Sequence, residues 1–404
     1  MTGPSKTLLA ATVAALTLSA SPAAFAQDAA VKLGFIGGIT GPIESLMPPI
    51  TNATKLAISQ VNAAGGIGKN GAKVEMVMGD DGCIDAARAS DAADRQVNSE
   101  KVAAIVGAMC SGATIAAANA AAIPGGVVMV SPSSTSPAVT ALDDKDLVFR
   151  TAPSDAYQGE VLARVVKKNG IDEVAVTYVN NDYGTGFAQS FKTAFEAAGG
   201  KVAVSQPHED GKADYRAEIG SLASSGAQAL VVLAYVDGSG GRIVNQARET
   251  GDFSTFIGGD GMVGAALTNT AGGDEKLILT RPGGTAAAGA ELYATAAKEA
   301  GFDPSATYAA TSYDAAFVLM LALEKTGGSR EGLSAALREV ASAPGEVILP
   351  GEWQKAKALI DEGKDINYEG ASGSLEFDAK GDVPGSYDEV TVRDGKIVPV
   401  GPAQ

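Results

Sequence analysis

The chain has 404 residues, of which 46% are hydrophobic, and this length and composition predict at least two domains with sizeable cores. Its 47 acidic residues outnumber its 31 basic residues, and the net charge of −16 argues against binding to nucleic acid or to anionic lipid surfaces. His208 is the only histidine, so most schemes of histidine-based catalysis lack a necessary group, and we expect neither an enzyme nor a metal site.

The first residues have the pattern of a secretory signal. Lys6 is the only charged residue before the apolar run Leu8–Ala20, which is too short to span a bilayer. Ala24-Phe25-Ala26 then provides a small-residue cleavage site. The sequence therefore predicts a signal peptide over residues 1–26 and an exported mature chain that begins at Gln27.

Beyond this segment, short apolar runs alternate with helical patterns of ten or more residues, which predicts βαβ units around a parallel sheet. The expected strands are Val31–Ile36, Val74–Met78, Val102–Val106 and Val127–Val130. The expected helices between them are Thr51–Asn62, Asp85–Asn98 and Ala113–Ala122.

The same alternation restarts after Phe149–Pro153 and predicts a second lobe of similar construction. Its expected strands are Glu173–Val179, Lys201–Ser205, Ala229–Leu233 and Thr255–Ile257. Its expected helices are Gln158–Lys168, Phe187–Ala198, Tyr215–Ser224 and Gly241–Thr250.

The last part of the chain places helices before further β segments, an order that suggests a segment returning to an earlier lobe. After a strand at Leu277–Leu279, the expected helices are Glu291–Ala300, Tyr313–Lys325, Leu333–Ser342 and Glu352–Asp361. The expected C-terminal β segments are Tyr368–Gly370, Gly373–Asp378, Val390–Val392 and Lys396–Val400.

Two loops of small hydroxylated residues follow strands of the first lobe. Cys110-Ser111-Gly112 comes after Val102–Val106, and Ser131–Thr135 comes after Val127–Val130. Ligands of open parallel sheets bind at the carboxyl ends of the strands. The two loops therefore predict a cradle for a small anionic group such as a carboxylate, although serine and threonine are also the usual residues of turns and helix N-caps.

Asp260, Tyr183 and Tyr235 follow predicted strands of the second lobe. Asp260 lies in a glycine-rich loop, where its carboxylate either pairs with the ammonium group of a ligand or is an ordinary turn residue. The two tyrosines either face the cleft or pack at the edge of the lobe. A carboxylate in one lobe, facing hydroxyl loops in the other, forms a site that suits an α-amino acid.

Cys83 and Cys110 are the only cysteines, and each follows a predicted strand. If those two strands are neighbours, the thiols lie within bridging distance. An even number of cysteines fits an oxidising compartment. The chain has no Cys-x-x-Cys pair, which argues against a redox role.

Together these motifs resemble the periplasmic substrate-binding proteins of branched-chain amino acid ABC transporters, the leucine/isoleucine/valine-binding family. The resemblance extends over nearly the whole mature chain. It is carried by Gly34–Pro42, Ala57–Ile67, Asp81–Cys83, Val106–Ser111, Ser131–Pro137, Phe149–Thr151, Asp182–Gly186, Tyr313–Ala315, Gly370–Gly373 and Phe377–Asp382.

The resemblance implies an α/β fold of two Rossmann-like lobes with parallel-rich central sheets and three hinge crossings, the type I periplasmic binding protein fold. One lobe would comprise residues 27–149 and 279–380, and the other residues 150–278 and 381–404. The resemblance also implies a periplasmic location, an L-amino acid ligand, no cofactor, an inner-membrane ABC permease as the partner, and a monomer.

Site roles follow from the same resemblance. Ser111, Ser134 and Thr135 match the residues that hold the α-carboxylate of the ligand. Asp260 takes the place of the acidic residue, often glutamate, that pairs with the α-ammonium group.

Further matches concern the walls of the site. Tyr183 and Tyr235 match tyrosines with which the second lobe covers the ligand, and Cys83 and Cys110 match a disulfide of some members. Leu46 stands where the family commonly has an aromatic residue, so the side-chain pocket would admit a longer or aromatic ligand.

Three other functions stay open from the sequence. One is a receptor for an amine-free ligand such as an aromatic acid, urea or a short amide, which would leave Asp260 without its expected partner. Another is an exported α/β hydrolase with Ser111 as the candidate nucleophile. The third is a soluble sensory module.

Overall fold

The structure is a computed structural model, and it describes residues 1–3, 30–270, 276–283 and 288–403. The predicted signal peptide, apart from its first three residues, lies outside the described residues. Within the described ranges, no helix is both long enough and apolar enough to cross a membrane.

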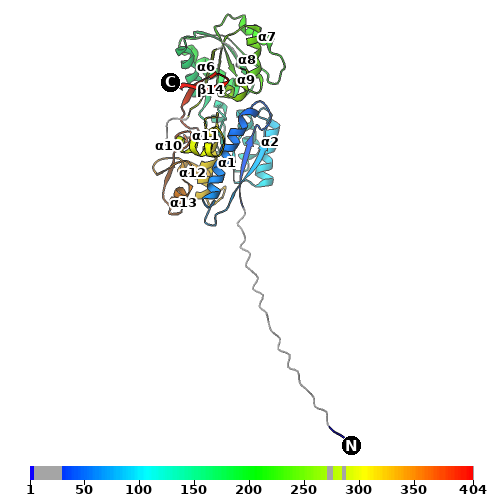
Figure 1. Ribbon diagram of the computed structural model, residues 1–404, viewed down its shortest axis with the longest axis vertical. Coiled ribbons are helices and arrows are strands. Elements are labelled where there is room, and N and C mark those ends of the chain that lie inside the picture. The colour runs from blue at the N-terminus through cyan, green and yellow to red at the C-terminus, as the bar shows by residue number, and fades with distance from the viewer. Residues whose placement is uncertain (4–29, 271–275, 284–287, 404) are drawn as a thin grey trace.

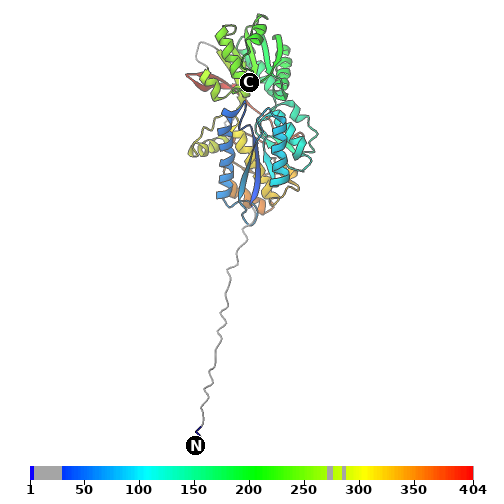
Figure 2. The same ribbon diagram turned by 90° about the vertical axis from the view of Figure 1, so that its right-hand side faces the viewer.

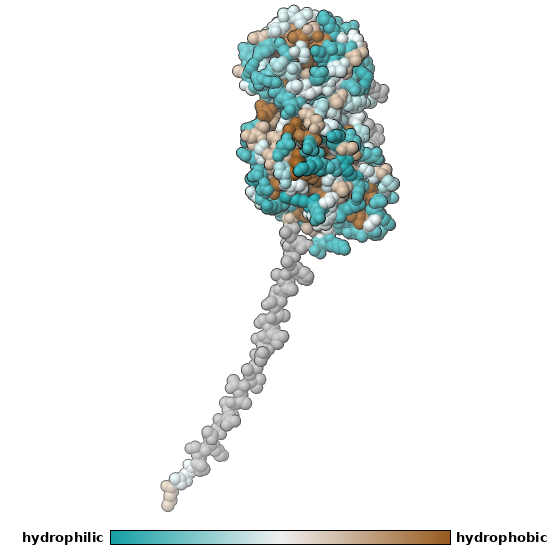
Figure 3. All heavy atoms as spheres, turned by 180° about the vertical axis from the view of Figure 1, so that it is seen from behind, coloured by the Kyte–Doolittle hydropathy of each residue, from teal (hydrophilic) through white to brown (hydrophobic). Residues whose placement is uncertain are grey.

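The described chain forms two lobes, each with its own sheet flanked by helices (Figures 1 and 2). Lobe 1, the lower one in Figure 1, contains α1, α2 and α10–α13, and lobe 2 contains α6–α9 and β14. A waist between the lobes is visible on the face shown in Figure 3. The predicted two-lobed α/β fold with parallel-rich sheets is confirmed.

The sheet of lobe 1 has five strands in the order β2-β1-β3-β4-β5, and all neighbours are parallel. The short central strands are buried on both faces, which explains why they read as continuous apolar runs in the sequence. The strands are β1 (Val31–Gly37), β2 (Val74–Asp80), β3 (Ala104–Val106), β4 (Met129–Ser131) and β5 (Val148–Arg150).

The centre of lobe 1 is α11 (Ala309–Lys325), which is buried from Thr311 to Glu324 and packs along α1 (Met47–Ala63). The remaining helices of this lobe are α2 (Ala86–Asp94), α3 (Ser111–Ala117), α4 (Pro137–Thr140), α10 (Ala288–Glu299), α12 (Leu333–Val340) and α13 (Trp353–Asp361). Single turns of other helix types occupy Glu44–Leu46, Arg95–Glu100 and Ala118–Ala122, and β11 (Glu346–Ile348) pairs with β12 (Ile366–Tyr368).

The sheet of lobe 2 has seven strands in the order β14-β13-β10-β9-β8-β6-β7, in which β13 is antiparallel to both of its neighbours. The strands are β6 (Glu173–Val179), β7 (Lys201–His208), β8 (Ala229–Leu233), β9 (Thr255–Gly258), β10 (Lys276–Pro282), β13 (Tyr387–Arg393) and β14 (Lys396–Ala403). The helices are α5 (Asp155–Lys168), α6 (Asp182–Ala197), α7 (Arg216–Ala223), α8 (Ser239–Thr250) and α9 (Ala265–Thr270), with a 3-10 turn at Asp260–Met262.

The chain passes between the lobes three times: from β5 to α5, from β10 to α10, and from β12 to β13. The three predicted crossings are therefore confirmed. β10 stays in the lobe 2 sheet through Pro282, beyond residue 278, where the first segment of this lobe was expected to end. The division into residues 27–149 with 279–380 and 150–278 with 381–404 stays a prediction.

Several helices begin earlier than the sequence predicted, and this changes where site residues lie. α6 begins at Asp182 rather than Phe187 because the Asn181 side chain accepts a hydrogen bond from the backbone N–H of Gly184 and caps the helix. Tyr183 is therefore in the first turn of a helix rather than in a loop. α3 likewise begins at Ser111 rather than at Ala113.

Two further sequence predictions differ from the structure. α1 begins at Met47 rather than Thr51, because its two prolines occupy the first turn, where a helix needs no backbone N–H from them. The predicted strand Gly373–Asp378 is wrong: only Ser374 pairs, in an isolated bridge with Glu369.

Candidate functional site

A small cavity of about 20 Å³ lies where the two lobes meet. Lobe 1 contributes Ile43, Leu46, Ile50, Met109, Cys110, Ser111, Ser133 and Tyr308, and lobe 2 contributes Tyr183, Tyr235 and Gly261. A cavity of this size holds little more than one water molecule. A larger ligand therefore enters only when the lobes separate or the lining side chains rearrange.

Hydrogen bonds across the interface hold the lobes together in a closed arrangement. They run from Ser45 N to Asp237 Oδ2 (2.7 Å), from Ser136 Oγ to Asp182 O (2.8 Å), and from Thr307 Oγ1 to Val263 O (2.9 Å). Separating the lobes breaks these hydrogen bonds, and any group that bridges the lobes adds to them.

Asp260 is fully buried beside this cavity and binds residues of both lobes. Its Oδ1 accepts hydrogen bonds from the hydroxyl of Tyr183 (2.6 Å) and the N–H of Gly261 (2.7 Å), and its Oδ2 accepts one from the hydroxyl of Tyr308. All three donors belong to residues of the cavity wall. Burial raises the pKa of Asp260, and the two tyrosine hydroxyls oppose that rise.

Gly261 is required by close packing around this carboxylate. A Cβ atom at this position would lie 2.7 Å from the carbonyl oxygen of Ala234 and 2.8 Å from the hydroxyl oxygen of Tyr183. Only glycine therefore allows the loop after β9 to bring Asp260 against Tyr183.

A second buried carboxyl group, Asp155, was missed by the sequence analysis. It is fully buried at the start of α5, and neither of its carboxylate oxygens makes a hydrogen bond of standard geometry among the described residues, although the hydroxyl of Thr135 lies close enough to lower its pKa. Burial, together with the nearby negative charge of Asp260, raises the pKa of Asp155 well above its ordinary value. In the sequence, an acidic residue after Ser154 looks like a common feature of a helix N-terminus, so no local signal distinguished it.

The tyrosines of lobe 2 form one wall of the cavity. The rings of Tyr183 and Tyr235 stack with centroids 5.2 Å apart and an angle of 20° between their planes. The side-chain amide of Asn181 donates a hydrogen bond to the hydroxyl of Tyr235 (3.3 Å). The structure therefore brings both predicted tyrosines together at the lobe interface.

The predicted hydroxyl cradle is only partly exposed to the cavity. Ser111 lines the cavity, and its Oγ accepts a hydrogen bond from the N–H of Ser136 (3.2 Å). The hydroxyl of Ser134 turns into lobe 1, 2.6 Å from Thr114 Oγ1, and the buried hydroxyl of Thr135 has no hydrogen-bond partner among the described residues. Binding of a carboxylate by Ser111, Ser134 and Thr135 stays a prediction.

The disulfide between Cys83 and Cys110 is present, with Cα atoms 5.2 Å apart. Cys110 lines the cavity and is the N-cap of α3, directly before Ser111. The disulfide therefore joins the loop after β2 to the loop that carries a predicted ligand-binding residue.

Leu46 lies in the apolar end of the cavity. It ends the 3-10 turn Glu44–Leu46 and lines the cavity with Ile43 and Ile50. This group offers an apolar surface to a ligand side chain, and the role of Leu46 in selecting that side chain stays a prediction.

The residues needed for metal binding or for a serine–histidine pair do not come together in the described part of the chain. No group of three or more His, Cys, Asp and Glu residues there is arranged to hold a metal ion. His208 lies in lobe 2, where its ring nitrogens are 2.7 Å from Thr177 Oγ1 and 2.9 Å from Ser239 Oγ, and burial lowers its pKa to about 4. It therefore serves lobe 2 packing and is not placed to activate Ser111.

Two lobes joined by three crossings, with a buried carboxylate and tyrosines at a cavity between them, define a two-lobed ligand-binding protein. The chain belongs to the family described as the receptor family ligand binding region, which matches residues 50–394. It is 32% identical over 312 residues to the leucine-, isoleucine-, valine-, threonine-, and alanine-binding protein of Pseudomonas aeruginosa, a match that covers 76% of this chain and 82% of that protein.

Solved structures agree with this assignment. A leucine binding protein LivK from Thermotoga maritima superposes with a TM-score of 0.78 at 26% identity, over 92% of this chain and 98% of that one. The branched-chain amino acid substrate binding protein LivJ from Streptococcus pneumoniae, in complex with isoleucine, gives 0.75 at 25% identity over 92% and 100%. A solute binding protein from R. palustris in complex with benzoate shares the fold, with a TM-score of 0.75 at 17% identity over 93% and 96%. The fold is that of the type I periplasmic binding proteins.

Proposed function

We propose that the protein is a periplasmic solute-binding protein that captures a branched-chain or other hydrophobic or aromatic L-amino acid by hinge closure and delivers it to an inner-membrane ABC permease. The observation that carries this proposal is Asp260, a fully buried carboxylate that binds tyrosines of both lobes beside the cavity. The names of its relatives, which include leucine-, isoleucine- and valine-binding proteins, support the same ligand class.

In this proposal the ligand bridges the two lobes and so favours the closed state. Its ammonium group reaches Asp260 by replacing the hydroxyl of Tyr183, and Asp155 lies nearby as a second buried carboxyl group. Its carboxylate binds the hydroxyl groups around Ser111 and Thr135 on the lobe 1 side.

The ligand side chain lies against the apolar group formed by Leu46, Ile43 and Ile50. Because all three residues are aliphatic, the binding free energy of an apolar ligand side chain becomes more favourable in proportion to the apolar surface that it buries against them. Export through a cleaved signal peptide over residues 1–26 belongs to the same proposal, and N-terminal sequencing of the secreted protein tests it.

A receptor for an amine-free carboxylic acid is the second candidate. Both oxygens of Asp260 already accept hydrogen bonds from the protein, so this carboxylate does not need an ammonium partner to be satisfied. We propose no hydrolase, because within the described part of the chain the hydroxyl oxygen of Ser111 is paired only with the N–H of Ser136, and the one histidine is engaged elsewhere.

A thermal-shift screen of the mature protein tests the proposal. The ligands are the free L-amino acids, their D-enantiomers, aromatic acids, urea and short amides. A ligand at about a hundredfold excess over its Kd stabilises the folded state by about 2.7 kcal/mol, enough to raise the Tm by several degrees. A response to aliphatic or aromatic L-amino acids supports the proposal, whereas a response confined to amine-free acids replaces it with the second candidate.

A further inference from the structure

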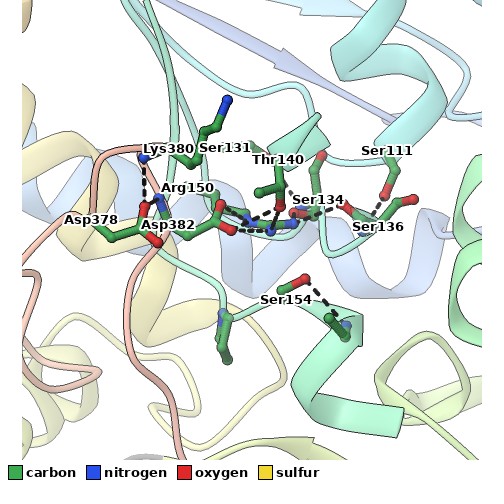
Figure 4. Close-up of polar contacts among 12 residues, drawn as sticks. Ser111, Ser131, Ser134, Ser136, Thr140, Arg150, Ser154, Asp378, Lys380 and Asp382 are labelled. Carbon is green, nitrogen blue, oxygen red and sulfur yellow. Dashed lines mark hydrogen bonds and ion pairs between the residues drawn. The ribbon is translucent and has the colours of Figure 1, made fainter. Parts of the chain in front are cut away.

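Arg150 is a fully buried cation at the point where the chain first leaves lobe 1. It is the last residue of β5, and it does not line the cavity between the lobes. Its guanidinium group forms five hydrogen bonds, one for each N–H that an arginine side chain carries, as Figure 4 shows. Because the Arg150 side chain is fully buried and each of its N–H groups donates a hydrogen bond, we infer that it holds the segments around it in place.

Two of these hydrogen bonds hold the loop that follows β4, residues 132–136, which we call the hydroxyl loop. Nη1 of Arg150 donates to the carbonyl oxygens of Ser134 (3.2 Å) and Ser136 (2.9 Å). The carbonyl oxygen of the residue between them, Thr135, accepts a hydrogen bond from the N–H of Asp155 (2.7 Å). Three consecutive carbonyl groups of this loop are therefore fixed by residues at the first crossing.

The other side of the guanidinium group binds the third crossing. Nε and Nη2 of Arg150 form a bidentate ion pair with Asp382, each at 2.7 Å, and the N–H of Arg150 donates to the carbonyl oxygen of Gly381 (3.0 Å). Thr140 connects the guanidinium group of Arg150 to the carboxylate of Asp382. Its Oγ1 accepts a hydrogen bond from Nη2 of Arg150 (2.5 Å) and donates one to Oδ2 of Asp382 (2.8 Å). Arg150 thus ties the hydroxyl loop to two of the three hinge segments.

We propose that Arg150 is a positioning residue for ligand binding: its guanidinium group fixes the position of residues Ser134–Ser136 relative to the hinge segments. Ligand affinity therefore depends on a residue that does not touch the ligand. This inference rests on the proposed function, which places the ligand carboxylate beside this loop. Only a planar fork with five donors reaches two loop carbonyls and a carboxylate at once, so lysine cannot replace it.

The same loop also contacts lobe 2, which connects its position to closure. The hydroxyl of Ser136 donates to the carbonyl oxygen of Asp182 at the start of α6, across the interface. If the loop loses its anchor on Arg150, this contact and the cradle around Thr135 shift together. The closed, liganded state is then weakened more than the open state, and dissociation becomes faster.

The test uses Arg150→Lys and Asp382→Asn in the mature protein, with L-leucine as the probe. Calorimetry gives the Kd, stopped-flow fluorescence gives the association and dissociation rates, and thermal unfolding gives the Tm. We expect a Kd at least about tenfold higher in both variants, arising mainly from faster dissociation, because charge-assisted hydrogen bonds to the loop and hinge are lost. In an Arg150→Ala variant, millimolar guanidinium, but not ammonium, should restore part of the affinity.

The control is the double variant Lys357→Met with Glu324→Gln, which removes the ion pair between the half-buried Lys357 and the buried Glu324 of lobe 1, far along the chain from the hydroxyl loop. It should lower the Tm and leave the Kd unchanged. Folded Arg150→Lys and Asp382→Asn proteins with the wild-type Kd and dissociation rate would overturn the positioning role alone. A wild-type protein that does not bind L-leucine or any other amino acid would overturn the proposed function, and this inference with it.

Discussion

The hydroxyl of Tyr308 donates a hydrogen bond to Oδ2 of Asp260 and so joins the start of α11 in lobe 1 to the loop after β9 in lobe 2. Tyr183 binds the other oxygen, Oδ1, from lobe 2. One buried carboxylate is therefore held by a tyrosine from each lobe. The group proposed to bind the ligand ammonium is thus also a contact that closes the hinge.

Replacing Tyr308 with phenylalanine should weaken amino acid binding. Tyr308→Phe leaves Oδ2 of a buried carboxylate without its donor and removes a contact of the closed state, and hydrogen bonds to charged groups are worth about 1.5–3 kcal/mol. We expect the Kd for L-leucine, measured by calorimetry, to rise about tenfold or more. The matched control is Tyr293→Phe, because the buried hydroxyl of Tyr293 has no hydrogen-bond partner among the described residues. Equal Kd values in the two variants would contradict the role of Tyr308.

Amino acid binding should weaken on acidification. Burial raises the pKa of Asp260, and burial together with the charge of Asp260 raises the pKa of Asp155. An ammonium ligand needs an ionised carboxylate, so protons compete with it as the pH falls through these raised pKa values, and full affinity is present only above them. Calorimetric titrations from about pH 8 to pH 4 should show the loss beginning above the ordinary carboxyl range. Affinity that stays constant down to about pH 4 would rule out this coupling.

The disulfide should contribute both to stability and to ligand affinity. Cys83 and Cys110 are 27 residues apart, and closing a loop of that length stabilises the fold by roughly 3–4 kcal/mol in the chain-entropy model. Urea unfolding of the double variant Cys83→Ala, Cys110→Ala should show a loss of about that size. Its Kd should also rise, because the disulfide holds Cys110, which lines the cavity directly before Ser111. Dithiothreitol should have the same effects on the wild type and none on the variant; a wild type that is insensitive to reduction would contradict the prediction.

Shortening Leu46 should change ligand preference rather than abolish binding. Leu46→Ala enlarges the apolar end of a small cavity, so the binding of L-phenylalanine should gain relative to L-leucine. A difference of one or a few methylene groups in an apolar pocket changes discrimination by about tenfold or more. The ratio of the two Kd values, compared with that of the wild type, measures the shift. An unchanged ratio would show that Leu46 does not border the ligand side chain.

Much of the fold could be predicted from the sequence because buried parallel strands read as continuous apolar runs. β6 and β8 have the bounds that were predicted for them, Glu173–Val179 and Ala229–Leu233. Helix starts were predicted less well, because an N-cap residue such as Asn181 cannot be told from a loop residue by its sequence alone. The strand predicted at Gly373–Asp378 is absent, because only Ser374 of this segment forms a β-bridge, and the backbone of Gly373 and Asp378 is engaged in turns.

The site was predicted only in part, and the missing residues share a physical cause. Asp155, Arg150 and Tyr308 act through contacts with segments distant in the chain, such as Asp382 and Asp260. The local sequence of Asp155 and Tyr308 gives no sign of these partners, because an acidic residue or a tyrosine at a helix start is common in any protein. Arg150 is an ordinary strand end until the fold brings Asp382 beside it. Tertiary packing alone brings Asp155 and Tyr308 beside the cavity and Arg150 to the hinge.

The most direct measurement compares L-leucine with 4-methylpentanoate, which is leucine without its amino group, on the wild type and on Asp260→Asn. We expect the wild type to bind L-leucine far more tightly than the analogue. Asp260→Asn should lose about a hundredfold in affinity for L-leucine, the usual cost of removing one partner of a buried charge pair, and little for the analogue. An Asp260→Asn variant that binds L-leucine with the wild-type Kd would contradict the central claim that this carboxylate recognises the ligand amine.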